Sequence, residues 1–317
     1  MAKKKNIVVI GGGTGTYTVL VGLKKYPVDL TAVVAMADDG GSTKTLREEF
    51  GVLPPGSVRP ALIALSNAPQ AIANLFQFRF AQGDNGLSGH NFGNLFLTAL
   101  TKQLGSFEKA IEAAGKILHI QGRVIPSTLE NCTLYAELES GEHIKGESNI
   151  DIPQHNGNLK IQKVWLDPVC KVNPKAIEAI AQADIIVIGP GDLYTSILPN
   201  FLVEGIADAV RTSKAKKVFV CNLMTKYGET TNFVAENFME VLEEYIGKGV
   251  LSHIIVNDKR PDEQRIKKYE QVNAHIVEYD KDSLKRRGVK VIEENVLRPM
   301  GLVRHNSDTL ARIICKL

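Results

Sequence analysis

The chain has 317 residues, 44% of them hydrophobic and 23% charged, with a formal net charge of +3 at pH 7. That length allows one large domain or two smaller ones, and the small net charge argues against a nucleic-acid partner. No run approaches the ~20 apolar residues of a membrane helix, which argues against a membrane partner. The four cysteines, Cys132, Cys170, Cys221 and Cys315, show no C-x-x-C spacing, so we expect reduced thiols in a soluble cytoplasmic protein.

Short β-branched runs alternate with helical segments over the first third of the chain. Residues 6–13 (NIVVIGGG) and 29–37 (DLTAVVAMA) predict buried strands. The capping-box pattern Thr45–Glu48 predicts a helix start near Thr45, and residues 60–83 and 92–115 are typical of helices. This alternation indicates an α/β fold, with a Rossmann-like parallel sheet and helices on both of its faces.

The middle of the chain, residues 116–170, has a different pattern. Short alternating strands are separated by the turn sequences SGEH and QHNGN, so we predict an antiparallel β-hairpin subdomain there. The α/β pattern resumes after Pro174, with strands expected around residues 185–192, 216–225 and 251–258. No linker rich in Pro, Gly or Ser divides the chain, and we expect a single α/β domain over residues 1–317 that carries the hairpin elaboration.

A glycine loop, VVIGGGTGT, joins the first strand to the first helix. Gly12 and Gly13 allow the backbone to approach a phosphate, and the helix N-terminus supplies free N–H groups and a positive dipole. Thr16 occupies the third glycine position of the dinucleotide fingerprint G-x-G-x-x-G. The loop therefore favours a phosphate or nucleotide over NAD, and a tight turn that serves only packing is the alternative.

An acidic pair, Asp38-Asp39, follows the second strand. A Rossmann-like sheet places a ribose-binding acid at about this position. Carboxylates also hold Mg²⁺ beside substrate phosphates, and an acidic pair before two glycines can simply form a turn near a helix start. All three interpretations stay open on the local sequence alone.

Two further loops carry polar side chains. The stiff turn PPGSVRP presents Arg59, which can clamp a phosphate or form a surface salt bridge. GLSGHNFGN places His90 and Asn94 in a glycine-bounded turn at an expected helix start. That setting suits anion binding or acid–base work, although a lone histidine is more often structural. The candidates for a catalytic role are Asp38, Asp39 and His90.

A second strand–glycine–helix junction, GPGDLYTSILPN, spans residues 189–200. Its polar groups and those after the next strand are expected at the same carboxyl edge of the sheet as the first loop. Their side chains are Tyr194, Thr195, Ser196, Asn200, Asn222 and Thr225. Together these loops describe a pocket for an activated, phosphate-bearing metabolite such as a nucleotide sugar or a nucleotide diphosphate ester. Zinc-ligand and nucleophile-elbow patterns are absent from the sequence.

The order of the motifs IGGGTGT, ADDGGST, PPG-x-x-R, GHNFGN, IGPGDLYTSILPN and CNLMTKYGET resembles that of the gluconeogenesis factor (YvcK-type) family. This family is related to the CofD-type 2-phospho-L-lactate transferases. The resemblance implies a CofD-like fold and a cytoplasmic regulatory protein that binds UDP-N-acetylglucosamine and requires no cofactor. Its role would link central carbon flux to cell-wall precursor supply and cell shape during gluconeogenic growth. Expected partners are a regulated cell-wall precursor enzyme and a second copy of the chain in a homodimer.

The resemblance assigns ligand contacts to residues in the matching motifs. They are Gly12, Gly13, Thr14, Asp38, Asp39, Arg59, His90, Asn94, Gly191, Leu193, Tyr194, Thr195, Ser196, Asn200, Asn222 and Thr225. Two positions depart from the family pattern, because Lys44 replaces a glycine and Ser57 replaces an aspartate. With one acid fewer and one cation more, the site is less suited to a divalent metal ion and remains suited to a diphosphate. We therefore predict no metal ligands and expect Lys44 to contact the ligand's diphosphate.

Two alternatives belong to a different class of protein. The first is a CofD-like transferase that uses Mg²⁺ to move a phospho-acyl group, of the 2-phospho-L-lactate or phosphoenolpyruvate type, from an activated nucleotide onto a deazaflavin. The second is an NAD-dependent oxidoreductase, which Thr16 and the lack of a positioned proton-transfer pair disfavour.

Overall fold

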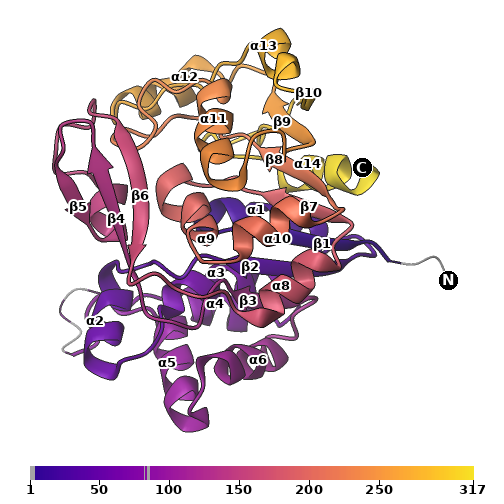
Figure 1. Cartoon of the computed structure of the whole chain (residues 1–317). Helices are drawn as coiled ribbons and strands as arrows, with labels where there is room; N and C mark the ends of the chain where they lie inside the picture. The colour runs from indigo at the N-terminus through magenta and orange to yellow at the C-terminus, as the bar shows by residue number, and fades with distance from the viewer. Residues whose placement is uncertain (1–3, 82, 84–85) are drawn as a thin grey trace.

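The computed structural model describes residues 4–317 apart from residues 82, 84 and 85. Seven parallel strands form its central sheet, in the order β10–β9–β8–β7–β1–β2–β3 (Figure 1). The strands are β1 (Asn6–Gly11), β2 (Asp29–Val34), β3 (Arg123–Pro126), β7 (Ile185–Ile188), β8 (Lys216–Val220), β9 (His253–Asn257) and β10 (Lys290–Glu294). The predicted α/β fold with a parallel sheet is confirmed.

The chain order in the sheet reverses at β1. Strands β2 and β3 follow on one side of β1, whereas β7 to β10 follow on the other. Open α/β sheets bind ligands outside the carboxyl ends of the strands at such a reversal. The loops after β1 and β7 therefore occupy the favoured position for a ligand.

Alternate side chains of β1 reach opposite faces of the sheet. Ile7 and Val9 pack into one buried cluster, and Val8 and Ile10 pack into the other. The first face is covered by α1 (Gly13–Leu23), α3 (Pro55–Leu65), α5 (Phe92–Leu104), α6 (Phe107–Ile117) and α14 (Ser307–Lys316). The second face is covered by α8 (Pro174–Ala181), η1 (Leu193–Ile197), α9 (Leu198–Phe201), α10 (Ile206–Thr212), α11 (Ala235–Ile246) and α13 (Lys281–Arg286).

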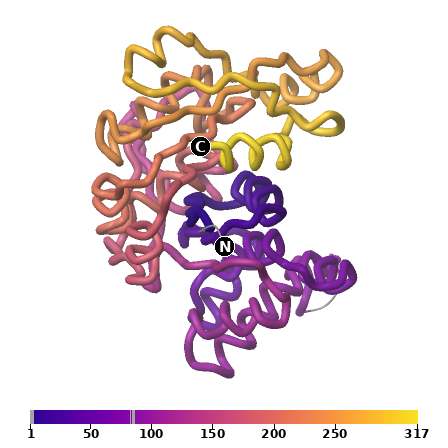
Figure 2. The backbone as a smooth tube through the Cα atoms, turned by 90° about the vertical axis from the view of Figure 1, so that its right-hand side faces the viewer, coloured from indigo at the N-terminus to yellow at the C-terminus, as the bar shows by residue number. Residues whose placement is uncertain are grey.

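The two ends of the chain meet on the first face. Figure 2 shows the yellow helix α14 beside the indigo α1. The approach is close because Gly22 has no side chain: a Cβ at this position would lie 2.0 Å from the carbonyl oxygen of Ser307. A glycine inside a helix is thus explained by helix–helix packing.

A smaller antiparallel sheet, in the order β5–β4–β6, extends from the main body. Its strands are β4 (Thr133–Leu138), β5 (His143–Lys145) and β6 (Ile161–Asp167), and the short helix α7 (Glu147–Asp151) follows β5. Leu134, Ala136 and Leu138 alternate along β4 and are fully buried against the second face of the main sheet. On the outer face Tyr135 and Trp165 stack with their ring centroids 5.4 Å apart.

Four predicted boundaries were wrong. The range 116–170 for the hairpin subdomain begins too early, because residues 123–126 form β3, which pairs with β2 in the main sheet. Helix α2 (Gly41–Phe50) begins at Gly41 rather than near Thr45, since Asp38 accepts hydrogen bonds from the Gly40 N–H and the Thr43 hydroxyl and orders the turn earlier.

The helix predicted over residues 60–83 is two helices, α3 and α4 (Gln70–Gln77). The chain is extended at Ser66, whose hydroxyl donates to the carbonyl of Leu118, and Pro69 precedes the first turn of α4. The segment 92–115 likewise divides at Gly105, whose φ of 65° ends α5 before Ser106 caps α6.

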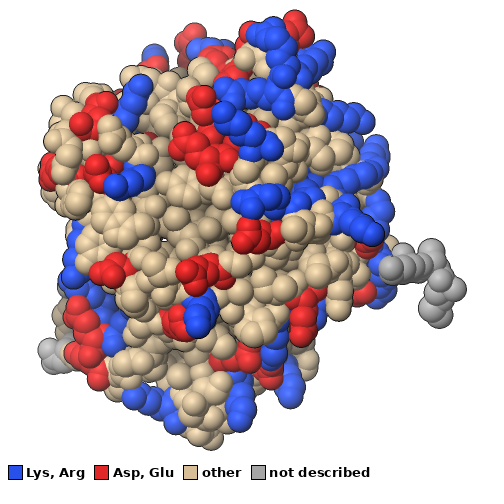
Figure 3. All heavy atoms as spheres, in the orientation of Figure 1, with Lys and Arg blue, Asp and Glu red and all other residues tan. Residues whose placement is uncertain are grey.

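The remaining helix, α12 (Glu263–Glu270), lies beside the C-terminal segment. Within the part of the chain that the structure describes, no helix combines the length and apolar character needed to cross a membrane. Lys, Arg, Asp and Glu side chains are interspersed over the face shown in Figure 3, without one sign of charge covering it.

Candidate functional site

The first cavity lies between the loops that follow β1 and β7. It has a volume of about 170 Å³ and is lined by residues 12–15, 190–192, 222–224 and 303–305 together with Thr18, Ser196 and Tyr269. We call it the glycine-loop cavity. It contains six of the predicted contacts: Gly12, Gly13, Thr14, Gly191, Ser196 and Asn222.

The two glycine loops touch because neither carries a bulky side chain. A Cβ on Gly15 would lie 2.0 Å from the carbonyl oxygen of Pro190. Asn222 fixes the second loop, since its Nδ2 donates to the Gly191 carbonyl at 2.9 Å and its Oδ1 accepts from the Gly191 N–H at 3.4 Å. Gly12 caps α1 without a side chain, so the first N–H groups of α1 face the cavity free of a capping group.

The C-terminal segment supplies the outer wall of the glycine-loop cavity. Arg304 is exposed there and forms no ion pair with any residue that the structure describes. The neighbouring Tyr269 is half-buried, and its hydroxyl donates to the Val303 carbonyl at 3.1 Å. His305 donates from Nε2 to the Cys221 carbonyl at 3.0 Å, and burial lowers its pKa to about 4. At neutral pH His305 is therefore neutral, and Arg304 carries the positive charge of this wall.

The second cavity, of about 320 Å³, lies where α2, α3 and α7 meet. It is lined by residues 40–43, 147–148 and 151–152 with Asp38, Gly56, Arg59, Arg79 and Asn94. We call it the arginine cavity. Arg59 is oriented by Asn94, whose Oδ1 accepts from the Arg59 Nε at 2.9 Å. Burial and the nearby Arg79 lower the pKa of Arg59, as expected for two guanidinium groups that face one small space.

Two carboxyl groups in the arginine cavity hold protons more tightly than usual. Burial is the main cause of the raised pKa of Asp38, although its hydrogen bonds from Gly40 and Thr43 oppose the shift. Burial, reinforced by the charges of Asp38 and Asp151, raises the pKa of Glu147 to about 9. Glu147 is therefore protonated at neutral pH and can donate a hydrogen bond into the cavity.

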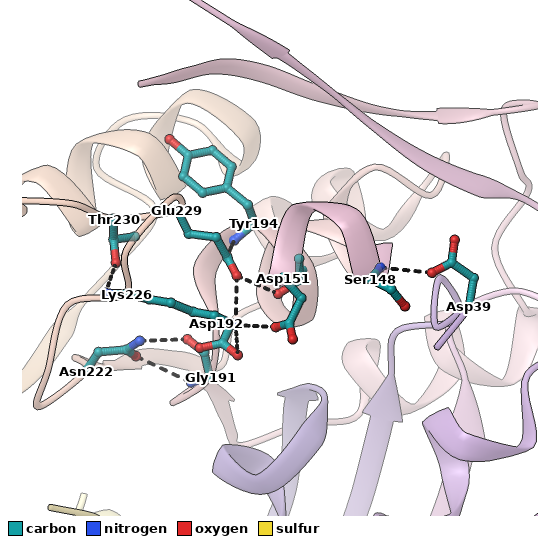
Figure 4. Close-up of polar contacts among 11 residues, drawn as sticks. Asp39, Ser148, Asp151, Gly191, Asp192, Tyr194, Asn222, Lys226, Glu229 and Thr230 are labelled. Atoms are coloured by element: carbon teal, nitrogen blue, oxygen red, sulfur yellow. Dashed lines mark hydrogen bonds and ion pairs between the residues drawn. The ribbon is translucent and has the colours of Figure 1, made fainter. Parts of the chain in front are cut away.

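Asp39 faces a third cavity, of about 620 Å³, between α2 and the antiparallel sheet. It shares this α2 cavity with Lys44, Arg47 and Lys145. Its Oδ1 accepts from the Ser148 N–H at 2.9 Å (Figure 4). The acidic pair is thus divided between two cavities, and Lys44 lies with Asp39 rather than beside the glycine loops.

A charged cluster separates the glycine-loop cavity from the arginine cavity. The Lys226 ammonium lies 2.9 Å from Asp192 Oδ2 and 3.1 Å from Glu229 Oε1, and it also pairs with Asp151 (Figure 4). Asp192 lines the first cavity and Asp151 lines the second. Burial lowers the pKa of Lys226, but the charges of Glu229, Asp192 and Asp151 outweigh burial and raise it overall, so the ammonium stays charged.

Several predicted residues lie in the interior instead of lining a cavity. Leu193 is fully buried, the Tyr194 hydroxyl donates to the Ile161 carbonyl at 3.4 Å, and the Thr195 hydroxyl donates to Glu229 at 3.0 Å. Asn200 donates to the Gly11 carbonyl at 3.3 Å and so supports the first glycine loop from below. These side chains hold the loops in place, and none of them lines one of the three cavities.

Two further predicted residues also act at a distance from the cavities. The Thr225 hydroxyl accepts from the His275 N–H at 2.8 Å and ties the loop after β8 to the C-terminal region. His90 pairs through Nδ1 with the Ser42 hydroxyl at 3.0 Å and supports the wall of the arginine cavity. His90 is thus positioned to orient Ser42.

Charged residues beyond the predicted set line these cavities, Arg304 and Arg79 among them, and others form a cluster between two of them. Asp192 and Lys226 lie inside the motifs GPGDLYT and TKYGET, so their proximity to predicted residues was an available signal. Glu229 lies in the same TKYGET motif as Lys226. Glu147 and Asp151 had no such signal, because they come from the antiparallel elaboration, whose position depends on the tertiary fold.

Comparisons with known proteins agree with this architecture. The family model described as "2-phospho-L-lactate transferase CofD" matches residues 7–297. The gluconeogenesis factor of Halalkalibacterium halodurans is 42% identical over 314 residues, which cover 98% of this chain and 96% of that protein. The gluconeogenesis factor of Bacillus subtilis is 40% identical over 321 residues, which cover 100% of this chain and 99% of that protein.

A solved structure shows the same fold throughout. The crystal structure of a Bacillus halodurans protein that is 41% identical superposes with a TM-score of 0.94 and covers 99% of this chain and 100% of that chain. Identity at this level over whole chains, together with the family model, settles the relationship. The chain belongs to the gluconeogenesis factor family, whose domain is of the CofD type.

Proposed function

We propose that this chain binds a nucleotide sugar in the glycine-loop cavity, with UDP-N-acetylglucosamine as the ligand. The observation that carries the proposal is the meeting of two glycine loops at the reversal of the sheet, beside the uncapped N-terminus of α1. A helix N-terminus with free N–H groups suits a diphosphate. The choice of UDP-N-acetylglucosamine follows what the sequence resemblance to the gluconeogenesis factor family implies.

The chemistry of the wall matches the parts of such a ligand. Gly12 to Gly15 offer backbone N–H groups to the diphosphate, while Ser196 and Asn222 offer polar side chains from the opposite loop. Arg304 supplies a positive charge and Tyr269 an aromatic surface for the base. Because about 170 Å³ is less than the ~300 Å³ of a typical small-ligand site, the sugar would extend beyond the cavity over its open rim.

In this proposal the chain is a cytoplasmic regulator without catalytic turnover. The bound sugar nucleotide reports the supply of cell-wall precursor, and the complex acts on a partner enzyme of precursor synthesis during gluconeogenic growth. We also propose a homodimer as the working unit. A regulator needs to bind its ligand and to change its contacts with a partner, and in this proposal the glycine-loop cavity serves the binding.

Isothermal titration of the full chain with UDP-N-acetylglucosamine tests the proposal. We expect one saturable site and, for Arg304→Ala, affinity lower by about tenfold, the scale of one charge-assisted contact. Arg298→Ala is the matched control, because Arg298 is an exposed arginine of the same segment that does not line the cavity. Absence of saturable binding, or equal losses in the two variants, would refute the proposed site.

One observation favours a second candidate function. The arginine cavity adjoins the glycine-loop cavity and contains Glu147, a carboxylic acid that keeps its proton at neutral pH. A CofD-like transferase would need such a group beside its nucleotide site to handle a proton during group transfer. The test is to incubate the chain with an activated nucleotide diester, with and without Mg²⁺, and to follow the release of free nucleotide by chromatography. Release that requires Mg²⁺ would favour this function.

A further inference from the structure

The Lys226 cluster, which consists of Lys226 with Asp151, Asp192 and Glu229, lies between the glycine-loop cavity and the arginine cavity. Among the residues that the structure describes, Asp151, Asp192 and Glu229 are a group that could hold a metal ion, since each offers a carboxylate oxygen and these oxygens lie within 4.8 Å of one another. They come from three separate segments, which meet between the glycine-loop cavity and the arginine cavity. The space among them already contains the Lys226 ammonium.

We propose that the Lys226 ammonium replaces a divalent cation in this chain, so that the site between the two cavities works without a metal ion. The ammonium has three N–H donors, and three carboxylates surround it. One contact goes to Asp192 at 2.9 Å, one to Glu229 at 3.1 Å and one to Asp151. Every donor of the cation is matched by a carboxylate.

The residues present do not fit Mg²⁺ while Lys226 stays in place. Magnesium requires oxygen ligands at ~2.0–2.1 Å in octahedral geometry and usually keeps several water molecules. A cation at the centre of this cluster would contact the ammonium directly, and two like charges repel. Lys226 supplies one positive charge to the three carboxylates from within the protein.

The surrounding turn holds the ammonium in position. The Lys226 N–H donates to the Thr230 hydroxyl at 2.9 Å, and the Thr230 N–H donates back to the Lys226 carbonyl at 2.8 Å. Glu229 accepts from the Tyr194 N–H and from the Thr195 hydroxyl, both at 3.0 Å. The cluster is therefore fixed by backbone and side-chain bonds, and Lys226 is not a mobile surface lysine.

The cluster also joins parts of the molecule that a ligand would span. Asp151 ends helix α7 of the antiparallel elaboration, and Asp192 belongs to the second glycine loop. Lys226 thus couples the elaboration to the glycine-loop cavity through charge. From this we expect a nucleotide diphosphate to bind equally well with and without metal, an expectation that rests on the proposed function. The exclusion of metal from the cluster does not.

Titration of the full chain with MnCl₂ alone tests the exclusion directly. We expect no saturable Mn²⁺ site in the wild type. Lys226→Ala should create one saturable site, with an affinity for Mn²⁺ at least about tenfold above any binding to the wild type. Lys226→Ala/Asp192→Asn should lose that site, because one carboxylate ligand of the metal is removed. Lys226→Arg is the matched control, since it keeps the positive charge and should bind no Mn²⁺.

Lys226→Gln provides a second test if the alanine variant does not fold. Its amide removes the charge but still donates hydrogen bonds to the carboxylates, and it should also gain the Mn²⁺ site. A wild-type Mn²⁺ site that Asp192→Asn abolishes would overturn the proposal. So would folded Lys226→Ala or Lys226→Gln protein without a new site.

A separate titration links the result to the ligand. UDP-N-acetylglucosamine should bind the wild type with the same affinity in EDTA and in MgCl₂, and a requirement for Mg²⁺ would contradict the replacement. If this ligand does not bind under either condition, the proposed function fails, while the MnCl₂ titrations still decide whether Lys226 excludes a metal.

Discussion

Glu147 is the carboxyl group whose protonation the structure perturbs in the most measurable way. It lines the arginine cavity from the first turn of α7, and burial together with the charges of Asp38 and Asp151 raises its pKa to about 9 from an ordinary value of 4.5. Replacing it by glutamine keeps the shape and the neutral state. We expect Glu147→Gln to stabilise the protein, and to do so more strongly as the pH rises.

The sign and size follow from proton linkage. Between pH 4.5 and about 9 the folded state keeps the Glu147 proton and the unfolded state releases it, so this group lowers the free energy of unfolding as the pH rises. Each pH unit corresponds to ~1.4 kcal/mol, which gives at most about 3 kcal/mol at pH 7. Because the side chain is only half-buried, solvent screening reduces this to about 1–2 kcal/mol.

Urea unfolding at pH 5, 6, 7 and 8 measures this effect, with far-ultraviolet circular dichroism and the fluorescence of Trp165, the single tryptophan, as two probes. The difference between Glu147→Gln and the wild type should be near zero at pH 5 and grow towards pH 8. Glu142→Gln, at an exposed turn of the same elaboration, should show no such trend. A constant difference across the pH range, or destabilisation at pH 8, would refute the assignment of a protonated Glu147.

Two further predictions concern the supports of the glycine-loop cavity. Asn200→Leu should lower the free energy of unfolding by ~1–3 kcal/mol in thermal or urea melts, because it leaves the buried carbonyls of Gly11, Ser196 and Ile197 without their donor; an unchanged melting temperature would contradict this role. His305→Gln should flatten the loss of stability between pH 6.5 and 4. The wild-type histidine is neutral in the fold with a pKa of about 4 and gains a proton on unfolding over that range, at a cost of up to about 3 kcal/mol. Parallel acid-unfolding curves for the two proteins would contradict it.

The sheet and its glycine loops could be predicted because their signals are local. Runs such as IVVI and IIVI are long enough to mark buried strands, and glycines directly after them mark the turns at the carboxyl edge. The alternation of such runs with helical segments is sufficient to indicate a parallel sheet. The placement of β3 in that sheet was not predicted, since four residues, Arg123–Pro126, resemble the short antiparallel strands that follow them.

The acidic pair shows how far local sequence can mislead. Asp38 and Asp39 are adjacent in sequence, but they face different cavities. The interpretations left open for the pair treated the two carboxylates as one unit, whereas the structure places each of them in its own cavity. Lys44 was expected at the ligand's diphosphate, but it lies one turn into α2 on the side of the antiparallel sheet.

The Lys226 cluster could not be predicted from the sequence. Lys226 and Asp151 are 75 residues apart, and Lys226 and Asp192 are 34 apart. Only the folded sheet brings the turn after β8, the loop after β7 and the end of α7 together. Charges that meet through tertiary structure leave no spacing pattern, whereas the glycines of a phosphate loop must be close in sequence to form the turn.

The central claim is that the two glycine loops hold the diphosphate of a nucleotide sugar. A crystal structure of the full chain with UDP-N-acetylglucosamine tests it most directly. We predict the diphosphate against the backbone N–H groups of residues 12–15, with Arg304 beside it and the sugar directed over the open rim. Ligand bound only in the arginine cavity or the α2 cavity, or no bound ligand at saturating concentration, would contradict the claim.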